Sequence, residues 1–131
     1  MMDFGCHRIE VLINLFGGIV RQAAGLTANV VFDRQVEDTA AVLLRFERGP
    51  CAAVVVTHAS RERQDTLHVF GTRGAIHVDD LNAGTLCIRT DTERVEQHPP
   101  APNVHQPLID DFVEAVRGDR EPAVTGETRA T

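Results

Sequence analysis

The chain has 131 residues, the size of one domain, and 43% of them are hydrophobic, which is enough to build a core. Its net charge is -6, with 19 acidic residues against 13 basic ones, and this excludes the basic surface that nucleic-acid binding requires. All 13 basic residues are arginines, so any chemistry that depends on lysine has to be supplied from elsewhere.

Three widely spaced cysteines, Cys6, Cys51 and Cys87, form neither a CxxC pair nor a zinc spacing, and they predict a reducing, cytoplasmic compartment. The sequence has no signal-peptide pattern and no apolar run near the roughly 18 residues that a membrane span needs. The first motif stands directly at the start, and a turn-like segment lies close to the end. We therefore expect residues 1–131 to be a single, truncated domain of a longer protein.

The first predicted element is a helix over about residues 4–16, which is ended by two glycines. Asp3 and His7 are four residues apart and so lie on one face of this helix. Gly5 stands between them without a side chain, and we expect another group to approach the backbone there. An imidazole titrates near neutral pH and a carboxylate can orient it, a combination suited to proton transfer. The pattern predicts that Asp3 and His7 are half of an active site.

A series of strands follows the helix. The apolar pattern predicts strands at residues 26–32, 36–47, 51–60, 66–70, 75–79, 85–89 and 93–98, joined by short turns as an antiparallel meander. The segment 51–60 is apolar on both faces, so one face can pack on helices while the other needs a cover from another domain or subunit. We expect Glu37 and Asp38 to be polar for structural reasons at a strand entry, and His68, His77 and His98 to be strand-surface positions.

A proline-rich spacer at residues 99–102 leads to a second amphipathic helix, in which Leu108, Phe112 and Val116 recur at helical spacing before Gly118 ends it. The order of helix, six or seven strands and helix predicts an α+β fold. We expect an open-faced, predominantly antiparallel β-sheet with helices packed on one face.

Six segments, in order, resemble the C-terminal domain of the Gfo/Idh/MocA oxidoreductases, the relatives of glucose–fructose oxidoreductase and inositol dehydrogenase. They are the Asp3-x-Gly5-x-His7 motif and residues 36–39, 46–49, 71–74, 108–112 and 121–127. The resemblance extends over nearly the whole chain. It implies that a Rossmann domain precedes this sheet domain, and that the sheet face makes a subunit interface in a homo-oligomer.

The same resemblance implies that the intact protein uses NAD or NADP, bound mainly by the missing N-terminal Rossmann domain. The implied substrate is a sugar, a cyclitol or a related hydroxyl or carbonyl compound. A lysine of the Rossmann domain would join Asp3 and His7 in catalysis, and the region of Asn103 and His105 would approach the substrate. This chain has no glycine-rich βαβ fingerprint and no lysine, so we expect it neither to bind the cofactor nor to turn over alone.

Several other interpretations of these residues remain open. Each candidate also has a purely structural interpretation. Asp3 would cap the helix, His7 would face solvent, and His105 would be a capping or loop residue. A metal site would combine Asp3 and His7 with His58, His77 or His105, but nothing selects the third ligand, and we predict no metal site. Cys6 adjoins His7, yet adjacent helical positions diverge by about 100°, so we expect Cys6 to be packed. The alternative function is a non-catalytic, sheet-mediated dimerisation or binding module.

Overall fold

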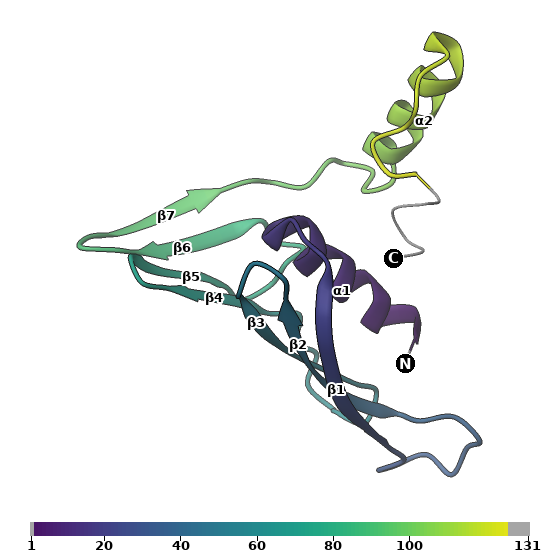
Figure 1. Cartoon of the computed structure of the whole chain (residues 1–131), viewed down its shortest axis with the longest axis vertical. Coiled ribbons are helices and arrows are strands. Elements are labelled where there is room, and N and C mark those ends of the chain that lie inside the picture. The colour runs from purple at the N-terminus through teal and green to yellow at the C-terminus, as the bar shows by residue number, and fades with distance from the viewer. Residues whose placement is uncertain (1, 126–131) are drawn as a thin grey trace. The chain divides into compact units, whose positions relative to one another are not determined.

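The computed structural model describes residues 2–125, with side chains from Gly5 onward, and the chain divides into two compact units, Met1–Glu62 and Arg63–Thr131 (Figure 1). The first unit contains α1 (Met2–Phe16), β1 (Val20–Ala28), β2 (Thr39–Phe46) and β3 (Cys51–Thr57). The second contains β4 (Leu67–Gly71), β5 (Gly74–Val78), β6 (Thr85–Arg89), β7 (Glu93–Gln97) and α2 (Gln106–Gly118). Over the described residues, neither helix has the length and hydrophobicity needed to cross a membrane.

The first unit is a three-stranded antiparallel sheet in the order β1-β2-β3, with α1 packed on one face. Leu12 of α1 is buried, and the ring of Phe16 meets that of Phe46 edge to face at 5.0 Å. Phe46 is only 2% exposed and is the centre of this small core. The helix ends as predicted at Gly17, whose positive φ of 58° lets its N–H donate to the carbonyl of Ile13 at 2.8 Å.

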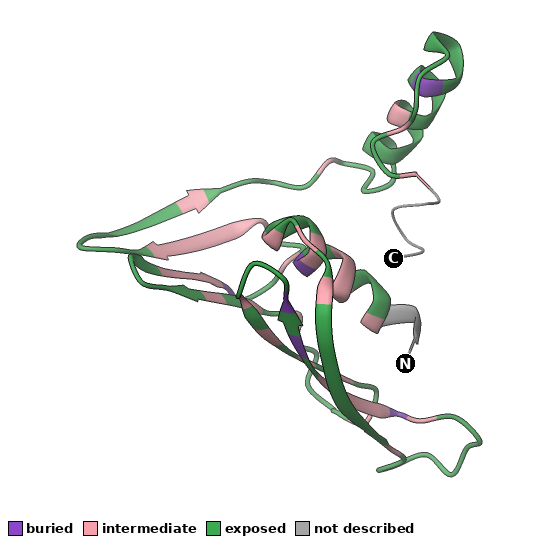
Figure 2. Ribbon diagram, viewed as in Figure 1, coloured by how far each residue is buried: buried purple, intermediate pink, exposed green. Residues whose placement is uncertain are grey.

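The other face of this sheet is open and apolar. Leu26, Leu43 and Val55 share it, and they are 64%, 63% and 70% exposed. The strand register places Leu26 opposite Ala41 and Ala41 opposite Val55, while Leu43 stands opposite both Ala24 and Ala53. Strand periodicity therefore gathers small and branched apolar side chains on the face away from α1. Figure 2 shows β1 as exposed along almost its whole length.

The second unit holds a four-stranded antiparallel sheet in the order β4-β5-β6-β7. Opposite pairs such as Leu67 with Val78 and Val69 with Ile76 line one face, where Val78 is buried. His68, Phe70, His77 and Cys87 occupy the alternate positions and so lie on the other face. Residues 71–74 form the turn between β4 and β5, so a strand follows this glycine pair, as expected.

The predicted fold class is confirmed as α+β with antiparallel pairing, and residues 2–125 form seven strands. Two details differ from the sequence prediction. The strands divide into two hydrogen-bonded sheets, and the strand expected at residues 26–32 is wrong because β1 covers Val20–Ala28 instead. The amides of Val30, Val31 and Phe32 donate to the Asp38 carboxylate and are therefore not available to a strand ladder.

Candidate functional site

The residues predicted to be catalytic lie at the beginning of α1. His7 is exposed and described, whereas the side chain of Asp3 lies outside the described part of the chain. The face of α1 that packs on the sheet carries Leu12 and Phe16. Because each residue turns the helix by about 100°, position 7 falls roughly opposite that packed face. His7 is therefore presented away from the core of its own unit and is exposed.

Gly5 does not have the role that the sequence suggested. A Cβ placed on Gly5 would lie 3.9 Å from Cγ2 of Val56 on β3, an ordinary van der Waals distance. The missing side chain at this position faces the protein's own sheet, so the expectation of an external group approaching there is wrong. The helix places Gly5 and His7 about 200° apart, so the two positions cannot face the same bound group. Cys6 was expected to be packed but is exposed.

Asn103 and His105 lie just before α2, in the second compact unit. The Oδ1 atom of Asn103 accepts the backbone N–H of His105 at 3.1 Å, and its carbonyl accepts the N–H of Gln106 at 3.0 Å. His105 is the N-cap residue, but its imidazole makes no capping bond and is exposed. Asn103 therefore shapes the turn, while the ring of His105 remains available for another partner. His7 belongs to the first unit, whereas Asn103 and His105 belong to the second.

Asp38 is a buried carboxylate of the first unit, and its expected role is structural. Its side chain is 3% exposed and accepts the N–H groups of Phe32, Val31 and Val30 at 2.8–3.0 Å, together with the Thr39 hydroxyl at 3.0 Å. The bonds from Phe32 and then Val31 hold its pKa well below the usual range of a carboxyl, against an opposing effect of burial. These partners belong to the loop between β1 and β2 and to Thr39, the first residue of β2, so the role of Asp38 is structural, as expected.

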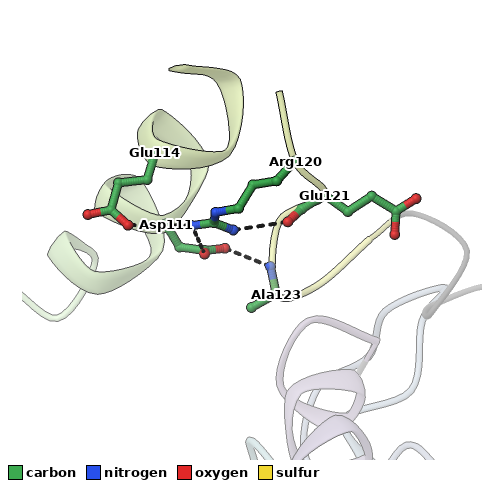
Figure 3. A network of polar contacts seen from close by, with 5 residues as sticks. All are labelled: Asp111, Glu114, Arg120, Glu121 and Ala123. Carbon is green, nitrogen blue, oxygen red and sulfur yellow. Dashed lines mark hydrogen bonds and ion pairs between the residues drawn. The ribbon is translucent and has the colours of Figure 1, made fainter. Parts of the chain in front are cut away.

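A second carboxylate, Asp111 of α2, joins the helix to the segment that follows it (Figure 3). Its Oδ2 accepts the N–H of Ala123 at 2.8 Å, and its Oδ1 accepts a bond from Arg120 at 3.0 Å. The Ala123 bond first, and the Arg120 guanidinium second, lower the pKa of Asp111. The signal in the sequence was the pair of segments 108–112 and 121–127, which this carboxylate links. Gly126 and Glu127 of the second segment lie outside the described residues.

Beside this network, α2 and the following segment enclose an open groove of about 720 Å³. Leu108, Phe112, Pro122 and Val124 give it an apolar lining, with Asp111 and Glu121 as its carboxylates. Neither Asn103 nor His105 lines it, so the groove and the predicted substrate residues are separate features of the second unit.

The described residues contain neither a dinucleotide fold nor a group of three or more His, Cys, Asp or Glu side chains able to hold a metal ion. Strand pairing in both sheets is antiparallel, apart from one isolated parallel bridge between Asp65 and Asp80. These residues therefore lack the Rossmann-type βαβ unit with a glycine-rich turn that the resemblance assigns to a preceding domain. His77, one of the candidate third ligands, instead has its Nδ1 atom 3.1 Å from that of His68.

Solved structures with a similar fold come from several bacteria. The UDP-N-acetylglucosamine 3-dehydrogenase of Acidithiobacillus ferrooxidans superposes with a TM-score of 0.83 at 21% identity, covering 98% of this chain and 41% of that chain. The aldose-aldose oxidoreductase of Caulobacter crescentus, solved with glycerol, gives 0.80 at 20% identity, covering 95% and 39%. The biliverdin reductase of Synechocystis, solved with biliverdin and NADP+, gives 0.81 at 16% identity, covering 98% and 41%.

This protein therefore spans about two-fifths of the length of these structures, and at such identities the likeness establishes the fold. No curated protein sequence matches the chain. The family model of the GFO/IDH/MocA C-terminal domain matches residues 1–77, which is more than half of the chain. The resemblance inferred from the ordered motifs is thereby confirmed, and the protein belongs to the GFO/IDH/MocA C-terminal domain family.

Proposed function

We propose that this chain is the substrate-binding and oligomerisation part of an NAD(P)-dependent oxidoreductase that acts on a sugar, a cyclitol or a related hydroxyl or carbonyl compound. The observation that carries the proposal is His7, an exposed imidazole on the family's first helix, presented away from the core of its own unit. The names of the similar structures, among them a UDP-sugar dehydrogenase and an aldose oxidoreductase, support this substrate class.

In this proposal residues 1–131 form one domain, and a preceding Rossmann domain binds NAD or NADP, which accepts or donates the hydride. This chain supplies the group that transfers the proton. Oxidation of a secondary alcohol requires removal of the hydroxyl proton, and the His7 imidazole acts as the general base that accepts it within hydrogen-bond reach. Asp3, one helical turn away, orients the ring or holds a neighbouring hydroxyl. His105 and Asn103 contribute to substrate binding, and the reaction takes place in the cytoplasm.

The test is to express the polypeptide with the coding region that precedes Met1 and to follow the absorbance of the reduced nicotinamide with a panel of UDP-sugars, aldoses and cyclitols. His7→Ala is expected to lower kcat by roughly 10²–10⁴-fold, the usual value of a general base. His98→Ala, a change at an exposed position just after β7, is the matched control and should leave kcat unchanged. Equal kcat values for wild type and His7→Ala would remove His7 from catalysis.

One observation also favours the second candidate, a non-catalytic dimerisation module: the open apolar face around Leu43 and Val55. This face requires a cover whether or not the chain takes part in catalysis. The two functions are distinguished by the upstream region, which must encode a βαβ unit with a glycine-rich turn if the first is correct. Its absence, together with dimerisation of this chain, would support the module.

A further inference from the structure

Two histidines stand directly opposite each other on β4 and β5. His68 and His77 are register partners, and their Nδ1 atoms are 3.1 Å apart. The ring centroids are separated by 5.1 Å. A single proton between two nitrogens at this distance makes one N–H···N hydrogen bond, with one ring as donor and the other as acceptor. When both rings instead carry their proton on Nε2, both Nδ1 atoms have a free lone pair and are available as ligands.

The rings are held by a neighbour on the same face of the sheet. Phe70 meets the His77 ring edge to face, with centroids 5.6 Å apart and an interplanar angle of 78°, and it lies 6.5 Å from the His68 ring. Such aromatic contacts restrict the side-chain rotamers of both histidines. His68 is exposed and His77 is half-buried, so solvent reaches the pair. Because both histidines stand on paired strands and contact Phe70, their nitrogens are held by a regular sheet rather than by a loop.

We propose that His68 and His77 form a two-nitrogen chelating site for a late first-row divalent transition-metal ion, the class that includes Ni²⁺, Cu²⁺ and Zn²⁺. Imidazole nitrogens bind such ions at about 2.0–2.1 Å. Two nitrogens 3.1 Å apart then subtend roughly 100° at the metal, between the 90° of octahedral or square-planar geometry and the tetrahedral angle. The N–H···N bond and the chelate share this separation, but in the chelate both Nδ1 atoms are deprotonated and their lone pairs turn away from the line between the nitrogens towards the metal.

The surroundings permit a cation at this position. Arg89 lies on the same face, two positions along β6 from Cys87, the register partner of His77. Its guanidinium is paired with Glu93 at 2.7 Å, which offsets its positive charge. Since the described side chains include no group of three potential ligands, water completes the coordination. The site is thus an open, two-ligand one that follows the Irving–Williams order, with Cu²⁺ bound more tightly than Ni²⁺.

The experiment is calorimetric titration of the 131-residue chain, prepared without a histidine tag, with NiCl₂. Nickel is the probe because, unlike Cu²⁺, it does not oxidise the three free cysteines. His68→Thr and His77→Thr each remove one nitrogen while keeping a residue suited to a strand. Each is expected to weaken the tightest Ni²⁺ site by roughly tenfold or more, the loss of the second arm of a chelate. His98→Thr, at an exposed position just after β7, keeps both Nδ1 ligands and should bind Ni²⁺ as wild type does.

A second measurement needs no variant. Paramagnetic Ni²⁺ broadens the NMR signals of the imidazoles it contacts, and those of His68 and His77 should broaden together at the lowest metal concentration. Unchanged Ni²⁺ affinity in both threonine variants would overturn the proposal. Earlier broadening of any other imidazole in the wild-type chain would also overturn it, since the tightest site would then lie elsewhere.

Discussion

Asp38 stabilises the loop between β1 and β2 only in its ionised form. Its carboxylate accepts three backbone N–H groups and one hydroxyl, and its pKa in the folded chain lies well below the usual value of about 3.9. A depressed folded pKa means that the unfolded chain binds the proton first as pH falls. The contribution of Asp38 is therefore fully present above about pH 5 and is lost progressively as pH falls from there through the folded pKa.

Asp38→Asn should lower the free energy of unfolding at neutral pH, because an amide offers one acceptor oxygen where the carboxylate offers two. The acid dependence should also become flatter below about pH 5, since the linked proton is gone. Urea unfolding followed by circular dichroism at several pH values measures both effects. Asp33→Asn, in the same loop but exposed, is the control and should keep the wild-type slope. A wild-type acid dependence in Asp38→Asn would contradict this role.

Phe46 is the residue on which the packing of α1 depends. Phe46→Ala should cost about 3–5 kcal/mol of unfolding free energy, because it removes a buried ring and leaves a cavity. Phe46→Leu retains most of the volume but loses the edge-to-face contact with Phe16, and about 1 kcal/mol should be lost. Urea midpoints of the two variants provide the comparison. Equal losses would mean that burial at this position does not govern stability.

The segment that follows α2 is tethered to the helix by the side chain of Asp111. Asp111 binds the amide of Ala123 and the guanidinium of Arg120, which itself donates to the carbonyl of Glu121 (Figure 3). Asp111→Ala should release residues 121–125 from α2. Amide hydrogen exchange at Ala123 is expected to accelerate by roughly tenfold, since the acceptor is a charged group.

Asp110→Ala is the matched control for this prediction. Asp110 is the adjacent carboxylate, and its bond is to Gln106 within the same helix, at 2.7 Å. Its replacement should leave exchange at Ala123 unchanged. The same acceleration in both variants would indicate that the helix itself had frayed, and that Asp111 is not a specific tether.

For the whole molecule, the open face of the first sheet is the feature with the largest consequence. Apolar side chains on β1, β2 and β3 surround Leu43, which is 63% exposed. We expect this face to join two copies of the chain, as in the proposed function. Leu43→Glu should raise the dimer dissociation constant by roughly 30-fold, which corresponds to about 2 kcal/mol, because a charge would be placed in an apolar contact.

Sedimentation equilibrium across a range of protein concentrations measures this change in assembly. Val95→Glu places the same charge at another exposed apolar position, on β7, and should leave the dissociation constant as in wild type. A wild-type chain that remains monomeric at high micromolar concentration would remove the sheet face as an interface.

Local rules made much of the fold predictable from the sequence. The glycines at 17 and 18 end α1, the turn at 48–50 joins β2 to β3, and α2 ends at Gly118, because each depends on neighbouring residues only. The ordered motifs also predicted the family, which the match over residues 1–77 confirms. The assignments of Asp3, His7, Asn103 and His105 to a site remain predictions.

The sequence by itself determined the helices, the order and antiparallel pairing of the strands, and the family, since periodicity, turn residues and motif order are local. Only the tertiary structure decided that the strands form two sheets, that Gly5 faces Val56, and that Asp38 draws the loop amides away from a strand. It also placed His68 opposite His77. These features depend on strand register and on contacts between distant residues, and a shift of one position would move every side chain of a strand to the other face.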